Sequence, residues 1–240
     1  MGSIGGKHLS RLAMPNTWKI KKKGIKWITK PLAGPHPLES GMPINLILKE
    51  ILGYAKTSRE VKKILNNQDI LIDGKRRKEP RFIVGLMDVL SIPNIKTSFR
   101  ILLDKKGHIF LKKIDEKESS LKLCKVVGKK PIKKKIQLNL FDGKNILIDK
   151  DDYKVGDSIL IELPSQKIIN HLKLEKNCSI YMTAGKKVGS VGVLQEIQKD
   201  KIVYKTEGKD NITLKKYAFV VGKEKPVIDL EVKKWTWWEI

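Results

Sequence analysis

Eight lysines and arginines but only one acid, Glu39, lie in the first 40 residues, and no hydrophobic period runs through them. Glycines and prolines interrupt this segment repeatedly, so it has no core of its own to fold around. The whole chain of 240 residues has a formal net charge of +24. Because such an excess destabilises a compact state through self-repulsion, it requires a polyanionic partner. Residues 1–42 are therefore predicted to be a basic extension that is disordered in the free protein and becomes ordered on that partner.

Nucleic acid is the partner that this charge favours, because lysines and arginines that neutralise phosphates release condensed counterions. An anionic membrane surface is the alternative. That alternative requires a basic amphipathic helix with bulky apolar residues opposite its cations, a pattern that residues 1–40 lack. Trp18 and Trp27 stand among the lysines. A purely electrostatic tail has no use for tryptophan, so we expect these rings to stack on bases or to pack on the protein body.

Residues 43–106 are predicted to form a compact module of two helices and a short sheet. Pro43 begins the first helix and Gly53 ends it, since the apolar residues between them recur at the spacing of one helix face: Ile44, Ile47, Leu48, Ile51 and Leu52. Thr57 and Glu60 form a capping box that opens the second helix. Asp73-Gly74 lies between two strand-like runs and predicts a tight hairpin.

Short strand patterns separated by glycine turns fill most of the remaining chain. We expect a central β-rich domain at 107–173, a small barrel at 174–222 and a C-terminal tail at 223–240. The tail contains Trp235, Trp237 and Trp238, which form either an anchor onto the body or a docking patch. The predicted fold class is therefore α+β and multidomain.

No pattern of a catalytic site is present in the sequence. The histidines and cysteines show neither metal-ligand spacing nor a nucleophile with its base, and phosphate-binding glycine loops are missing. We expect no enzymatic activity, no metal and no cofactor. Cys124 and Cys178 lie in apolar contexts, which favours buried free thiols in a reducing compartment over a disulfide. No apolar run approaches the ~18 residues of a membrane-spanning helix, and the first residues lack the apolar core of a signal peptide.

Five sequence signatures resemble those of S-four-e, a family of archaeal and eukaryotic small-subunit ribosomal proteins. They are HLSRLAMP at 8–15, GPHP at 34–37, VGLMDV at 84–89, KLCKV at 122–126 and QLNLFDGKN at 137–145. In order and spacing, the likeness extends from residue 5 to about residue 222. There are departures: Lys134-Lys135 stand where a glycine pair is usual, Phe141 where histidine is common, and Asn177 where glycine is expected.

The resemblance implies an S-four-type RNA-binding fold for 43–103 and a KOW motif in an SH3-like barrel for 174–208. The KOW signature falls on Gly185, Gly189 and Gly192. The implied role is that of a structural component of the small ribosomal subunit, bound to the ribosome in the cytoplasm, that binds the 5′ region of the subunit's rRNA.

Other classes of protein fit the sequence less well. An RNA-modifying enzyme requires a further catalytic domain of ~150 residues, for which 104–240 is too short and too broken into strands. A transcription elongation factor with a KOW motif would be less basic and would carry another domain upstream. A free-standing RNA-binding protein or a KOW-type transcription or translation factor stays open as the alternative.

The predicted rRNA-binding residues are cations and rings of the extension, the two-helix module and the KOW loop. They are Lys7, His8, Arg11, Trp18, Lys19, Lys21, Lys22, Lys23, Lys26, Arg59, Lys62, Lys63, Lys75, Arg76, Arg77, Lys78, Lys186 and Lys187. The predicted partners are small-subunit rRNA and neighbouring small-subunit ribosomal proteins. We expect no membrane binding and no homo-oligomer.

Overall fold

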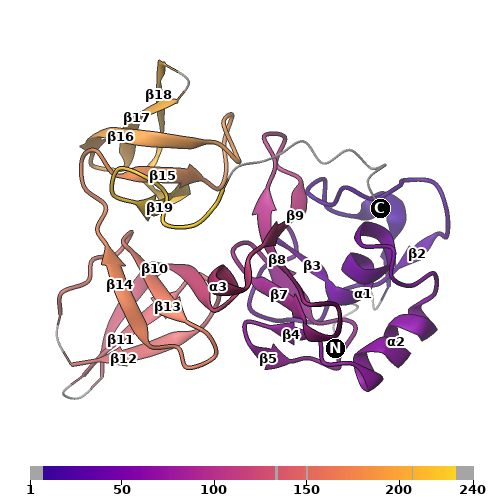
Figure 1. The fold of residues 1–240 in the computed structure, drawn as a ribbon. Helices are drawn as coiled ribbons and strands as arrows, with labels where there is room; N and C mark the ends of the chain where they lie inside the picture. The colour runs from indigo at the N-terminus through magenta and orange to yellow at the C-terminus, as the bar shows by residue number, and fades with distance from the viewer. Residues whose placement is uncertain (1–7, 133–134, 150, 207, 231–240) are drawn as a thin grey trace, which may run out of the picture.

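The computed structural model describes residues 8–132, 135–149, 151–206 and 208–230. Within these ranges the chain consists mainly of short antiparallel strands with a few short helices (Figure 1). The α+β class expected from the sequence is therefore wrong, and the fold is mostly β. The tryptophans of the C-terminal tail, together with Lys7, Lys133 and Lys134, lie outside the described residues.

The N-terminal segment pairs β1 (Leu9–Ser10) with β2 (Trp27–Ile28), and a 3-10 turn at Arg11–Ala13 follows β1. The following module contains a five-stranded sheet in the order β5-β4-β7-β8-β9. Its strands are β4 (Leu71–Ile72), β5 (Lys75–Arg76), β7 (Val89–Ile92), β8 (Thr97–Leu103) and β9 (Ile109–Ile114), with a 3-10 turn at Pro93–Ile95. A second, two-stranded sheet pairs β3 (Gly41–Pro43) with β6 (Ile83–Gly85).

The helices of this module differ from the two amphipathic helices expected there. The first is an α-helix only over α1 (Ile44–Leu46) and continues as a π-helix over Ile47–Ile51. Residues 44–48 are all buried. Within this buried run, Asn45 donates to the side-chain oxygens of Thr29 in the N-terminal segment and of Ser58. The apolar spacing predicts a helical stripe but not burial on every side.

The second helix, α2 (Ser58–Asn67), has the start that the sequence predicts. Thr57 accepts a hydrogen bond from the amide of Glu60, and the Glu60 carboxylate accepts one from the amide of Thr57. These reciprocal bonds hold the first turn, and the pKa of Glu60 is lowered, chiefly through the backbone amide of Lys56. Val61 and Leu65 are fully buried, so the opposite face of α2 is left for its charged residues.

Two further five-stranded antiparallel sheets complete the chain (Figure 1). After α3 (Glu116–Ser119), the central sheet has the order β12-β11-β10-β13-β14, with β10 (Leu121–Ile132), β11 (Lys135–Leu140), β12 (Asn145–Ile148), β13 (Ser158–Glu162) and β14 (Ile168–Leu172). The C-terminal sheet has the order β18-β17-β16-β15-β19, with β15 (Ser179–Met182), β16 (Val191–Gln198), β17 (Lys201–Thr206), β18 (Lys209–Leu214), a 3-10 turn at Lys215–Tyr217 and β19 (Ala218–Gly222).

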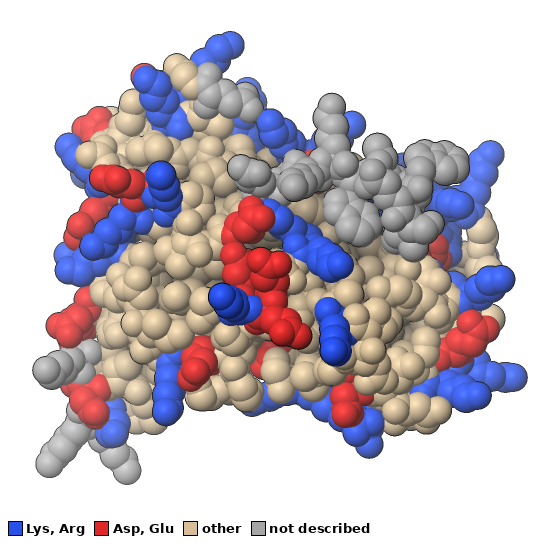
Figure 2. All heavy atoms as spheres, viewed as in Figure 1, with Lys and Arg blue, Asp and Glu red and all other residues tan. Residues whose placement is uncertain are grey.

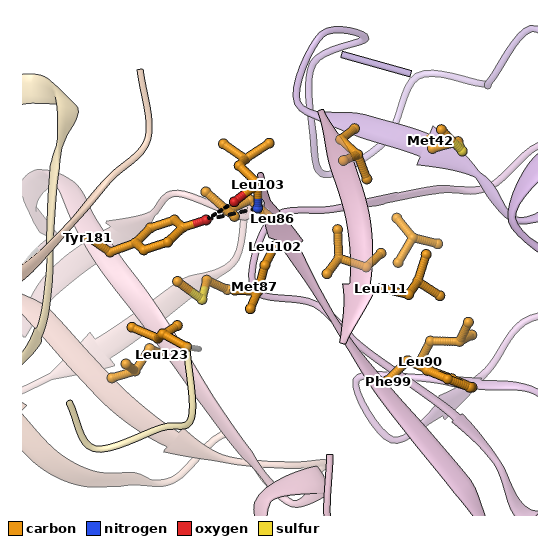
Figure 3. Close-up of a cluster of buried hydrophobic side chains, with 14 of the residues drawn as sticks. Met42, Leu86, Met87, Leu90, Phe99, Leu102, Leu103, Leu111, Leu123 and Tyr181 are labelled. Atoms are coloured by element: carbon orange, nitrogen blue, oxygen red, sulfur yellow. Dashed lines mark hydrogen bonds between the residues drawn. The ribbon is translucent and has the colours of Figure 1, made fainter. Parts of the chain in front are cut away.

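One hydrophobic core joins parts of the chain that the sequence suggests are separate. It includes Trp18 from the N-terminal segment, Leu102 from β8, Leu123 from β10 and Tyr181 from β15. Figure 3 shows side chains of β8, β10 and β15 converging, with the Tyr181 hydroxyl bonded to the backbone of Leu103. The central sheet also has a small core of its own around Val126 and Leu138. The sheets therefore support one another rather than folding as isolated units.

Candidate nucleic-acid interface

The outward face of α2 presents three cations in one row. Arg59, Lys62 and Lys63 are all exposed, while Val61 and Leu65 of the same helix face the core. Their spacing of three and four residues places them on one side of the helix. Such a row of exposed cations suits an irregular phosphate surface rather than the reading of base edges.

The β4–β5 hairpin lies beside the end of α2. Arg76 joins the two elements, because its guanidinium donates to the carbonyl oxygen of Asn66 at 2.9 Å and pairs with the Asp69 carboxylate at 2.9 Å. Lys75 and Lys78 are exposed on the same hairpin segment. Arg77 is half-buried, with its guanidinium 4.4 Å from the centre of the Phe82 ring. Arg76 thus ties the hairpin to the end of α2, whereas Lys75 and Arg77 line a cavity beside the hairpin.

The N-terminal segment divides its predicted RNA contacts into exposed and buried residues. His8 and the lysines are exposed, and the His8 ring lies 5.5 Å from the ring of exposed Trp27; the lysines are Lys19, Lys21, Lys22, Lys23 and Lys26. Arg11 is buried instead: it donates to the carbonyl oxygens of Lys21 and Ile25 and pairs with Glu50 at 3.0 Å. Arg11 therefore closes the basic loop onto the first helix.

Trp18 is also buried, at 2 % exposure, and its indole nitrogen donates to the carbonyl oxygen of Gly41 at 2.8 Å. Of the two roles expected for the tryptophans, Trp18 thus packs on the protein body, whereas Trp27 is 53 % exposed. The amide of Ile109 also donates to Thr17 next to it. Residues 8–42 are consequently built into the fold, which differs from the expectation of a segment that is disordered without a polyanion.

Lys186 and Lys187 are exposed in the loop between β15 and β16. Gly189 closes this loop with a left-handed φ of +73°, and a Cβ there would lie 2.5 Å from the carbonyl oxygen of Asp104. Only glycine permits both the backbone conformation and the close approach. The basic loop is therefore held against the β8–β9 turn.

A buried charge network lies behind these surfaces, formed by Lys122, Asp73, Asp88, Asp142, Lys144 and His36. The Lys122 ammonium lies 2.6 Å from Asp73, 2.6 Å from Asp88 and 2.8 Å from Asp142. The three carboxylates are close enough to hold a metal ion. Lys122 already lies among them and compensates their charge, so the group does not fit a resident metal.

Burial and charge compete in this network. Burial disfavours the ionised forms of both Asp88 and Lys122. The attraction between the opposite charges outweighs this effect, so the pKa of Asp88 lies below its ordinary value and the pKa of Lys122 lies well above its own. Burial is the main cause that raises the pKa of the adjacent Cys124 thiol, which is a free cysteine, as is the buried Cys178. The Asp88 carboxylate and the Lys122 ammonium are therefore both ionised at neutral pH, and a chemically quiet thiol lies beside them.

The network also ties three parts of the chain together. His36 from the N-terminal segment lies 2.9 Å from the Asp88 carboxylate, and Lys144 of the central sheet lies 2.6 Å from Asp73. Gly85 makes room for the His36 ring, since a Cβ at that position would lie 2.3 Å from it. Four of the five sequence signatures each contribute a residue here. The sequence showed those signatures but carried no sign that they meet.

Comparisons with known proteins match these segments. Residues 5–39 match the RS4NT (NUC023) domain, 42–90 the S4 domain and 95–168 Ribosomal family S4e. The chain is 48% identical over 238 residues to small ribosomal subunit protein eS4 of Methanosphaera stadtmanae, covering 96% of this chain and 98% of that protein. It is 41% identical to eS4 of Korarchaeum cryptofilum, covering 96% and 100%.

A solved structure supports the same assignment. The crystal structure of the 30S ribosomal protein S4e from Thermoplasma acidophilum matches with a TM-score of 0.68 and 30% identity, covering 77% of this chain and 96% of that chain. The basic S4 module and the matched segments on either side of it define a ribosomal protein that contains an S4 domain. The chain belongs to the eS4 family, as the sequence signatures predicted.

Proposed function

We propose that the chain is a structural constituent of the small ribosomal subunit that binds the 5′ region of the subunit's rRNA and catalyses no reaction. Its membership of the eS4 family and its S4 domain support this role. The formal net charge of +24 supplies the electrostatic reason, because phosphates neutralise it and release counterions on binding. It acts on the ribosome in the cytoplasm, without cofactor or metal.

The observation that carries the proposal is the joined basic surface of α2 and the β4–β5 hairpin. Arg76 ties the hairpin to the end of α2 through Asn66 and to Asp69 just beyond it. We assign this basic surface to rRNA phosphates: Arg59, Lys62, Lys63, Lys75, Arg76, Arg77 and Lys78. The exposed lysines of the N-terminal segment with Trp27 and His8, and the loop with Lys186 and Lys187, form two further contacts. Arg11 and Trp18 position the N-terminal segment.

A different face of the molecule suits a protein neighbour. Figure 2 shows acidic side chains gathered at the centre of one face, over α3, and lysines and arginines mostly around its rim. The acidic residues of α3 are Glu116 and Glu118. Carboxylates repel phosphates, so we assign the centre of this face to a neighbouring ribosomal protein or to solvent.

Among the described residues no helix is long and apolar enough to cross a membrane.

We further propose that the chain divides as the sequence suggests, into 1–42, 43–106, 107–173, 174–222 with its KOW loop in an SH3-like barrel, and 223–240. The division at 106 falls between two strands of one sheet, since β8 and β9 are paired through six residue pairs. The units therefore share structure at their boundaries. We expect a single copy in each subunit rather than a homo-oligomer.

The salt dependence of rRNA binding tests the proposed surface. In Lys62→Ala/Lys63→Ala the slope of log K against log salt should fall by about 0.7 to 0.9 for each phosphate that is no longer neutralised. The matched control is Lys113→Ala/Lys117→Ala, which removes two exposed lysines near the acidic face. Filter binding of the full chain to a 5′ fragment of small-subunit rRNA measures both. Equal slopes for the two double variants would remove the surface from the interface.

A further inference from the structure

A cavity of about 400 Å³ opens where four distant segments of the chain meet. The β4–β5 hairpin, the turn at 142–144, residues 34–35 and Gln166 surround it. Its volume lies within the roughly 300 to 1,000 Å³ of small-ligand sites. The sequence pattern places Lys75 and Arg77 of this cavity on a phosphate surface but contains no sign of an enclosed site.

The walls of the cavity are held in place from behind. The buried charge network forms its floor, where Asp73, Asp88 and Asp142 already accept hydrogen bonds from Lys122 and from backbone amides. At one side Gly74, with φ of +73°, lies so close to Pro164 that an added Cβ would be 3.0 Å from that ring. A site with such fixed walls is organised before any ligand arrives.

The lining carries the surfaces that bind an unpaired base. The Arg77 guanidinium lies over the Phe82 ring at 4.4 Å, and both side chains line the cavity. Guanidinium planes and aromatic rings are the platforms on which single-stranded bases stack.

Gln166 adds a group that can read a base edge. Gln166 lines the cavity, and its side-chain amide can both donate and accept. Its backbone has a left-handed φ of +61°, which residues other than glycine and asparagine rarely adopt. The backbone N–H of Gln166 donates to the carbonyl oxygen of Glu162 at 2.8 Å. This bond holds the backbone of Gln166 in that unfavourable conformation at the edge of the cavity.

The charge of the lining favours an anion over a cation. The carboxylates at the floor are already paired, while Lys75 is exposed and lies, with Arg77 and Lys144, around the same space. A phosphate group would be attracted to this side of the cavity. The occupant must therefore combine a flat ring, a hydrogen-bonding edge and a phosphate.

We propose that this cavity holds one unpaired nucleotide of rRNA, with its base against Arg77 and Phe82, its edge read by Gln166 and its phosphate near Lys75. The proposal rests on the proposed rRNA binding. It assigns to the chain a site for a single base, which the exposed phosphate contacts do not require. The occupant is RNA rather than a protein side chain, because only a nucleotide supplies the ring, the edge and the anion together.

Uncharged substitutions separate this site from the phosphate surface. Phe82→Leu should raise the Kd for the 5′ rRNA fragment by roughly 5- to 100-fold, and Gln166→Ala by about 10-fold. Neither should change the salt slope, because both variants keep every cation that neutralises a phosphate. Gln195→Ala, which removes an exposed glutamine of β16, is the matched control and should leave the Kd unchanged. Thermal unfolding midpoints of all three variants confirm that they fold.

Chemical probing of the bound rRNA identifies the occupant. With the wild-type chain, one nucleotide of the fragment should be protected from dimethyl sulfate or kethoxal, and in the Gln166→Ala complex that same nucleotide should react. If Gln166→Ala binds like the Gln195→Ala control and no nucleotide changes its reactivity, the proposal is wrong. If the nucleotide is protected in whole subunits but not in the complex with the rRNA fragment, the cavity would be assigned to a protein neighbour instead. Failure of the wild-type chain to bind the fragment at all would overturn the proposed function itself.

Discussion

The phenol oxygen of Tyr181 lies 2.8 Å from the amide nitrogen of Leu103 and 2.8 Å from its carbonyl oxygen (Figure 3). One hydroxyl therefore satisfies both backbone groups at the end of β8 and fastens the C-terminal sheet to the sheet that contains β8. Tyr181 is fully buried, and that burial raises the pKa of its phenol well above the ordinary value. The hydroxyl is therefore protonated at neutral pH and can donate.

Removing that hydroxyl should destabilise the junction between the two sheets. Tyr181→Phe leaves the amide and the carbonyl of Leu103 buried without partners, which costs about 1 to 3 kcal/mol of the free energy of unfolding. Denaturant titration measures the loss. Tyr204 of β17, in the same sheet, is buried too, but the structure records no hydrogen bond of its hydroxyl with the described residues, so Tyr204→Phe serves as the control. Equal losses in the two variants would show that the bonds to Leu103 add nothing.

Replacing Lys122 should be among the most damaging single changes in the protein. Lys122→Met leaves three buried carboxylates without their shared cation, a change of the kind that costs about 3 to 5 kcal/mol. Lys144→Met removes a more exposed cation from the same network and should cost much less. Unfolding by urea compares the two variants. A loss for Lys122→Met no larger than that for Lys144→Met would contradict the central place given to Lys122.

The network also predicts how stability depends on pH. Burial disfavours the ionised forms of Asp88 and Asp142, but Lys122 and the other cations outweigh it and lower both pKa values in the folded state. The carboxyl group of an aspartate in the unfolded chain has a pKa of about 3.9. The stabilisation that the ionised carboxylates of Asp88 and Asp142 contribute is therefore fully present above that pH and is lost as the pH falls below it toward their folded pKa values. Urea unfolding from pH 7 down to pH 2 should show this decline. In Lys122→Met the decline should be shallower, because the main cause of the lowered pKa is gone.

Gly85 should tolerate no side chain. An added Cβ would lie 2.3 Å from the buried His36 ring, so Gly85→Ala must displace His36 from Asp88 and should cost about 1 to 3 kcal/mol. Gly128→Ala is the control, since a Cβ there would meet only the side chain of Asn139 at 3.6 Å. Thermal unfolding of both variants tests the prediction, which fails if their midpoints coincide.

The two N-terminal tryptophans should separate stability from binding. Trp18→Ala removes a buried ring and its bond to Gly41, and should cost about 3 to 5 kcal/mol of unfolding free energy. Trp27→Ala removes an exposed ring beside Lys26 and should leave stability nearly unchanged while weakening rRNA binding. Calorimetry and filter binding on the same samples compare them. The reverse pattern, with Trp27 carrying stability, would contradict the assigned roles.

Short-range signals made α2 predictable. A capping box and a row of apolar residues act within a few turns, and no distant contact is needed to read them. The preceding helix shows where such signals stop, because the pattern that predicts a helical stripe also occurs in a segment whose residues 44–48 are all buried and that is wound partly as a π-helix. The α+β fold class failed for a related reason. The helical signals stood out in the sequence, but the short strands outnumber them in the described chain.

The sequence by itself determined the charge of the chain, its family, the cations that face outward on α2 and the glycine turns between its strands, because these depend on residue type and local spacing. The tertiary structure alone decided that Arg11 and Trp18 face inward while neighbouring lysines face solvent. It also decided that His36, Asp88 and Lys122 meet in one network and that Gln166 closes a cavity beside Arg77. Burial and pairing depend on which distant segments the fold brings together, and neither composition nor periodicity carries that information.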